Sequence, residues 1–223
     1  GWKVTANGPI RANNEYDGEE YDARMELTGW SEVGYDDSQW AKAERTDIPT
    51  GQLRGQMTPG MTVQSYHKLM KPTKTIPGPI EWQELKPLPG KPDTYVIDFG
   101  QNMAGWVSLM PHGKAGDTIR VRYAEKLNAD GTLYTENLRN ARSTDTYVCN
   151  GREPVTKEWN HDTAWRPTFV YHGFRYVEVS GMKDLNARQI VAEEVYDGIA
   201  VFPYSFSCSD TILNKVVQNA CRG

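Results

Sequence analysis

Short apolar runs, separated by glycine, proline and asparagine, dominate the chain from about residue 93 to residue 207. The clearest run covers residues 118–123, where Ile119, Val121 and Tyr123 alternate with polar residues. An alternation with a period of two places the apolar side chains on one face of a β-strand. Runs of the same kind occur at residues 95–99, 105–110, 146–149, 174–179, 189–195 and 201–202. Many short strands without interleaved helices predict an all-β fold, an antiparallel β-sandwich.

Two sections before residue 93 have a different pattern. Residues 1–47 are polar and acidic, and they hold too few apolar side chains to form a core of their own. They are expected to be the closing part of a preceding β-domain, with one short helical turn at residues 21–25. Residues 48–92 are rich in proline and glycine, with six prolines between residues 71 and 92. Since proline cannot donate to a strand ladder, this section is expected to be a connector with an edge strand at residues 62–69.

The hydrophobic period changes to that of a helix at the end of the chain. Ser209 suits an N-cap, and the apolar residues between Ile212 and Ala220 fall on one helical face. The strand pattern assigns residues 93–207 to the sandwich. The change of period assigns residues 208–223 to a linker and the first part of an amphipathic helix. The chain has no initiator methionine and stops within this helix. We expect both ends to be cut and the apolar stripe of the helix to pack on a partner.

Composition narrows the classes of function. The chain has 223 residues, with 25 basic and 29 acidic side chains and a net charge of -4, so no basic field exists for nucleic acid or for an anionic membrane surface. No apolar run approaches the roughly 20 residues that span a bilayer. The three cysteines are widely separated and form no motif with metal-ligand spacing. We expect no nucleic-acid partner and no membrane partner.

Four segments carry a resemblance to a known family. They are GPI at residues 8–10 with YDGEEYDAR at residues 16–24, DFGQNMAGW at residues 98–106, YHGFRYVEV at residues 171–179, and FSCSD at residues 206–210. In this order they resemble parts of bacterial α-L-rhamnosidases, family 78 of the glycoside hydrolases. The first resembles the end of the N-terminal domain, the next two resemble the concanavalin-like (jelly-roll type) sandwich, and the last resembles the opening of the catalytic α/α barrel.

The resemblance implies an activity for a longer protein. Members of the family release terminal α-L-rhamnose with inversion, which needs two carboxyl groups about 6.5–9.5 Å apart. The family places both groups in the barrel, downstream of Gly223, so no catalytic residue is assigned to this chain. The implied partner is the catalytic barrel of the same polypeptide, with a rhamnosylated glycoside as ligand. No cofactor is expected, although calcium stays open, and a bacterial parent leaves a periplasmic, secreted or cytoplasmic location open.

An acidic group near the start of the chain is the first candidate for contact with substrate or barrel. Asp17, Glu19 and Asp22 lie close together, and Asp17 and Glu19 would share a face of an extended segment. A sugar or a metal ion could bind there. The alternative is an acidic loop that is solvated or docked on a neighbouring domain, with its charge partly neutralised by Arg24.

The second set of candidates combines amides with aromatic side chains. Gln101 and Asn102 follow an expected strand at a turn, where they could contact sugar or barrel or simply satisfy backbone groups. Trp159 and Trp165 flank the polar loop at residues 160–162 and are expected to be the better exposed tryptophans, where they could stack on a sugar ring or serve the fold alone. His172 stands beside aromatic residues and is interpreted as structural.

Four hypotheses follow for this chain. The leading one is a non-catalytic accessory region that supports the barrel and shapes one wall of the substrate pocket. The alternatives are an independent carbohydrate-binding module, a structural spacer without ligand, and an enzyme in its own right. Hydrolysis of an aryl α-L-rhamnoside by the chain alone separates the last from the others, and titration with rhamnose separates module from spacer.

Overall fold

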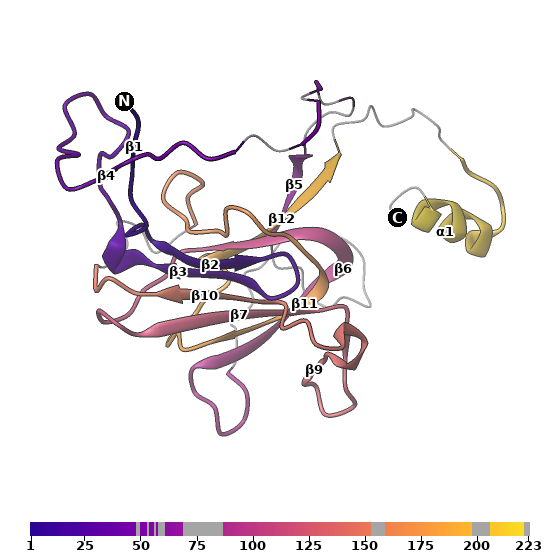
Figure 1. Ribbon diagram of the computed structural model, residues 1–223. Helices are drawn as coiled ribbons and strands as arrows, with labels where there is room; N and C mark the ends of the chain where they lie inside the picture. The colour runs from indigo at the N-terminus through magenta and orange to yellow at the C-terminus, as the bar shows by residue number, and fades with distance from the viewer. Residues whose placement is uncertain are drawn as a thin grey trace.

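A computed structural model describes residues 1–47, 50–52, 54–55, 57, 61–68, 87–152, 159–197 and 206–220. Eight strands form one curled sheet in the order β2-β3-β10-β7-β11-β6-β12-β5 (Figure 1). Their bounds are β2 Ile10–Asn14, β3 Gly18–Asp22, β5 Met61–Lys68, β6 Thr94–Leu109, β7 Thr118–Ala124, β10 Thr144–Val148, β11 His172–Ser180 and β12 Ile190–Asp197. Neighbouring strands are antiparallel except β3 and β10, which run parallel. The all-β class predicted from the alternating pattern is confirmed.

Small elements surround this sheet. They are the pairs β1 Lys3–Val4 with β4 Ala41–Lys42 and β8 Lys126–Leu127 with β9 Leu133–Tyr134, the 3-10 turns η1 Ala23–Met25 and η2 Glu136–Leu138, and the helix α1 Thr211–Ala220. The turn η1 is the helical turn expected at residues 21–25. No helix in the described part of the chain is long and apolar enough to cross a membrane.

The core follows the alternation of the sequence. In β7, Ile119, Val121 and Tyr123 are at most 1% exposed, while the residues between them face the other side of the strand. The paired strand β11 places Val177 and Val179 in the same core. Each such side chain stabilises the fold by about 1.5–3 kcal/mol relative to an exposed one.

Strand β6 differs from the expectation of two runs joined by a turn. It continues from Thr94 to Leu109, and the turn expected at residues 98–102 is wrong. Residues 99–102 bulge opposite the single residue Arg175 of β11. Gly100 has a φ of 80°, and its N–H donates to Asp98 Oδ1 at 2.7 Å, so a local side-chain bond supports the bulge without ending the strand.

The first section of the chain joins the main sheet. The hairpin β2–β3 attaches through β3, which pairs with β10 at Glu20↔Thr146. Residues of β3 and β10 that contact each other, such as Glu19 and Asp145, lie 126 residues apart in sequence. The hydrophobic pattern around either strand therefore does not predict this parallel pairing. The domain boundary placed at residue 47 stays a prediction.

The two ends of the sheet region agree in part with the sequence pattern. The strand expected at residues 62–69 is β5, at the edge of the sheet. The strand expected at residues 201–202 and most of the proline-rich connector lie outside the described residues. At α1 the expected cap Ser209 is wrong, because Asp210 Oδ1 accepts the N–H groups of Ile212 (2.8 Å) and Leu213 (3.3 Å).

Candidate functional site

The acidic candidates of the first section do not converge on one face. Glu19 is fully buried, and its carboxylate accepts the backbone N–H groups of Thr168 (3.0 Å) and Phe169 (3.3 Å) and the amide of Asn13 (3.0 Å). Asp17 lies in the turn before β3 and accepts the backbone N–H of Arg142 at 3.2 Å. The expectation that Asp17 and Glu19 share an open face is wrong, because the strand directs Glu19 into the core.

Burial has an electrostatic consequence for Glu19. Desolvation raises the pKa of its carboxyl group, and the N–H groups of Thr168 and Phe169 offset part of this rise. The proximity of Asp145 raises the pKa further. These contacts join β3 to the segment before β11, so Glu19 acts as a structural tie.

Asp22 and Arg24 form a local pair at the end of β3. Asp22 accepts from the Arg24 Nε at 2.9 Å and Nη2 at 2.7 Å, and also from the Arg24 backbone N–H as the cap of η1. These hydrogen bonds hold the pKa of Asp22 below its usual range. The neutralisation of acidic charge by Arg24, foreseen in the sequence, is present.

A buried polar network surrounds Asp145, which the sequence analysis did not single out. Its Oδ2 accepts the Tyr123 hydroxyl at 2.7 Å, its Oδ1 accepts the Glu19 N–H at 2.9 Å, and His172 Nε2 lies 3.1 Å from Oδ1. The other ring nitrogen, Nδ1, lies 3.2 Å from Ser143 Oγ. The sequence could have revealed this site, because Asp145 shares the buried face of β10 with Tyr147, and a carboxylate at such a position needs buried partners.

Ser143, His172 and Asp145 contact one another in the order of a Ser-His-Asp catalytic triad, but they are not accessible to a substrate. All three side chains are buried, and His172 stacks on Tyr123 with ring centroids 4.1 Å apart. A nucleophile must reach its substrate, which burial in a packed core prevents. Burial and Asp145 raise the pKa of Tyr123 well above its usual value. The interpretation of His172 as structural agrees with this geometry.

The polar residues of the β6 bulge bind their own sheet. Asp98 accepts from Arg175 Nε and Nη2, each at 2.8 Å, and Asn102 donates to Glu125 Oε1 at 2.8 Å. Burial raises the pKa of Asp98, but the hydrogen bonds from Arg175 and Gly100 outweigh it and leave the pKa below its usual value. Gln101 is half-buried beside them. A role of Gln101 and Asn102 in substrate or barrel contact stays a prediction.

The tryptophans expected to be exposed lie largely inside the fold. Trp165 is 8% exposed, and its ring lies 5.1 Å from that of Tyr147. Its expected exposure is wrong because its backbone forms a bridge with Leu109 of β6, with both hydrogen bonds at 2.9 Å, which draws the side chain into the core. Trp159 is half-buried and donates to Ser108 Oγ at 2.9 Å.

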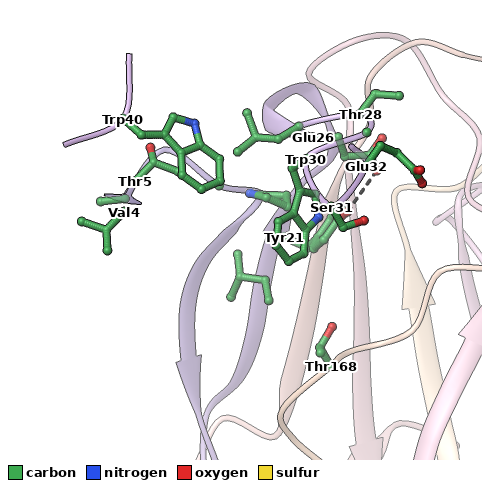
Figure 2. A pocket seen from close by; sticks show the side chains of 16 residues that line it. Val4, Thr5, Tyr21, Glu26, Thr28, Trp30, Ser31, Glu32, Trp40 and Thr168 are labelled. Atoms are coloured by element: carbon green, nitrogen blue, oxygen red, sulfur yellow. Dashed lines mark hydrogen bonds between the residues drawn. The ribbon is translucent and has the colours of Figure 1, made fainter. Parts of the chain in front are cut away.

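A cavity of about 910 Å³ lies beside the hairpin β2–β3, and we call it the aromatic cavity. Figure 2 shows Trp40 and Thr5 on one side of it and Trp30 and Tyr21 on the other. Trp30 is 62% exposed, and the Tyr21 hydroxyl donates to Glu26 Oε1 at 3.0 Å. Aromatic walls with a few polar groups are typical of small-ligand sites.

The sequence did not predict the aromatic cavity. Trp30 and Trp40 stand among glycine, aspartate and glutamate, and only the fold brings them to the same cavity as Tyr21. Within the described ranges, no group of three or more histidine, cysteine, aspartate or glutamate side chains is placed to hold a metal ion.

The described strands define the chain as an all-β region built on one curled sheet. Residues 90–196 match the bacterial alpha-L-rhamnosidase concanavalin-like domain, and residues 1–65 match the alpha-L-rhamnosidase N-terminal domain. The chain belongs to the bacterial α-L-rhamnosidase family.

Two curated relatives and one solved structure support this assignment. An alpha-L-rhamnosidase of Streptomyces avermitilis is 37% identical over 222 residues, which is 100% of this chain and 19% of the relative. One from Formosa agariphila is 35% identical over 227 residues, 100% of this chain and 22% of the relative. The crystal structure of the Streptomyces avermitilis enzyme complexed with L-rhamnose superposes with a TM-score of 0.79 at 34% identity, over 97% of this chain and 19% of that one. The chain thus spans about a fifth of these relatives.

Proposed function

We propose that this chain is a non-catalytic region of an α-L-rhamnosidase and supports a catalytic α/α barrel in the same polypeptide. The whole protein would release terminal α-L-rhamnose with inversion, using two carboxyl groups of that barrel. The observation that carries the proposal is that three carboxylates of this chain are bound by groups of the chain itself. Glu19 and Asp145 are buried in hydrogen bonds, and Asp98 is bound by Arg175. An inverting pair must instead face a substrate and a water molecule.

The helix α1 supports a partner of this kind. Ile212, Leu213 and Val216 are 73%, 51% and 57% exposed. A helix of ten residues is marginal in water without packing on its apolar face. We assign residues 1–47 to the end of the N-terminal domain, 48–92 to a connector, 93–207 to the sandwich and 208–223 to the start of the barrel. The rest of the barrel would cover the exposed apolar residues of α1.

The chain alone is expected to show no hydrolysis of an aryl α-L-rhamnoside, whereas a polypeptide that also contains the barrel hydrolyses it. The reason is that Glu19 and Asp145 are buried in the hydrogen bonds of the fold and Asp98 is bound by Arg175, and that the two carboxyl groups of inversion are proposed to lie in the barrel. Release of the chromogenic aryl group measures the rate. Turnover by the 223-residue chain that persists through independent purifications would refute the accessory assignment.

A rhamnosylated glycoside is the ligand that we propose for the aromatic cavity. L-Rhamnose is the probe, because the Streptomyces avermitilis structure was solved with it. Loss of one aromatic contact of about 1 kcal/mol corresponds to a several-fold loss of affinity. We therefore expect Trp30→Ala to weaken rhamnose binding about fivefold in a calorimetric titration.

The matched control is Trp2→Ala, since Trp2 is 88% exposed and does not line the cavity. It is expected to leave the affinity within about twofold of the original chain. A flat titration of the unmodified chain with rhamnose would instead show that the aromatic cavity does not bind this sugar.

A further inference from the structure

A second groove, of about 870 Å³, crosses the face of the sheet that points away from the core. Its floor is built by the outward positions of two paired strands: Arg120 and Arg122 of β7 lie directly opposite Thr146 and Thr144 of β10. The segment after η2 adds Arg139 at the rim. The same alternation that buries Ile119 and Val121 therefore places arginines and hydroxyl groups side by side on this face.

The charge of this arginine groove is opposite to that of the chain. Four arginines line it, with Arg142 as the fourth, against the two carboxylates of Asp17 and Glu20. The chain as a whole has a net charge of -4. Such a local excess of positive charge on an acidic protein favours an anionic ligand.

The four arginines differ in how far they are already neutralised. Arg122 Nη1 lies 3.0 Å from Glu178 Oε1, and Arg142 Nε lies 3.5 Å from Asp17 Oδ1. Within the part of the chain that the structure describes, Arg120 and Arg139 have neither an ion pair nor a side-chain hydrogen bond. Two guanidinium groups in one groove are thus left with their donors unused.

The backbone at the rim supports a functional position for Arg139. Its φ of 56° lies in the left-handed region, which a residue with a large side chain seldom adopts. Strain of this kind persists only where the surrounding structure enforces it, and it is frequent at ligand sites. Arg139 is the C-cap of η2, where its N–H donates to the Glu136 carbonyl oxygen, and from this position its side chain lines the groove.

We propose that the arginine groove binds an acidic saccharide, with its carboxylate or sulfate group held by Arg120 and Arg139. Guanidinium groups bind such anions through two parallel hydrogen bonds. The hydroxyl groups of Thr144 and Thr146 face the same space and suit the hydroxyl groups of a sugar. None of the groove's lining residues is aromatic, so stacking on a neutral sugar does not account for this site. The choice of a saccharide over another anion rests on the proposed function.

The test is a calorimetric titration of the 223-residue chain with trigalacturonate, a sulfated galactose oligomer and neutral galactotriose. We expect saturation with at least one acidic oligomer, with weaker binding at higher salt, and no saturation with galactotriose. The tighter of the two acidic oligomers identifies the anionic group. Arg120→Gln and Arg139→Gln are each expected to weaken binding about tenfold.

The matched control is Arg45→Gln, which removes an exposed arginine that does not line the groove and is expected to change affinity by less than about twofold. Thermal melting of each variant confirms that it is folded. Equal binding of galactotriose, no saturation with either acidic oligomer, or an equal effect of Arg45→Gln and Arg120→Gln would overturn the proposal. Rhamnoside hydrolysis by the barrel-containing polypeptide is measured separately, so a failure here is distinct from a failure of the proposed function.

Discussion

Replacement of Asp145 by alanine is expected to lower the free energy of unfolding by about 3–5 kcal/mol. Asp145 is fully buried and accepts hydrogen bonds from the Tyr123 hydroxyl and the Glu19 N–H, and it lies 3.1 Å from His172 Nε2. Its removal leaves these donors buried without an acceptor, which costs about 1–3 kcal/mol for each group. Urea denaturation followed by tryptophan fluorescence measures the change.

This loss is a large part of the whole stability, since domains are stable by only about 5–15 kcal/mol. Asp162→Ala is the control, because the Asp162 side chain is 90% exposed and its change is expected to stay within about 0.5 kcal/mol. Tyr123→Phe removes the hydroxyl that donates to Asp145 and accepts the Val107 N–H, and should cost about 1–3 kcal/mol. If Asp145→Ala were as stable as Asp162→Ala, the network would not support the fold as described.

The part of the fold that the sequence predicts is the part governed by alternation. Strands β7 and β11 lie within a few residues of their expected bounds, because their apolar residues repeat with the period of a strand. The short helical turn after β3 was also predicted, and the structure shows that Asp22 caps it through a local hydrogen bond. Both depend on residues that are close in sequence.

The features that the sequence did not predict depend on distant partners. The parallel pairing of β3 with β10 joins Glu20 to Thr146, and the burial of Trp165 follows from a backbone bridge to Leu109. The candidate sites also depend on contacts between residues that are distant in sequence. Asp17 and Glu19 are neighbours in sequence but contact different elements, whereas Arg120 and Arg139 line one groove.

Replacement of Gly18 by alanine tests how the first section of the chain is held on the sheet. Gly18 begins β3 with a φ of 106°, and an added Cβ would lie 2.1 Å from the Thr144 carbonyl oxygen and 2.8 Å from Asp145 Oδ1. The left-handed backbone costs about 1–3 kcal/mol for alanine, and the overlap with a neighbouring strand costs about as much again. We expect a loss of about 3 kcal/mol or more in the free energy of unfolding, measured by urea denaturation.

Gly131→Ala separates the two causes. Gly131 has a φ of 85°, but a Cβ there would meet no atom within 4 Å, so only the backbone strain of about 1–2 kcal/mol applies. The excess loss in Gly18→Ala therefore measures the close approach of β3 to β10. Hydrogen exchange should show faster exchange at the Glu19 N–H in that variant, because this N–H donates to Asp145 from the strand that the methyl group displaces. Equal losses for the two variants would mean that β3 can shift on β10 without cost.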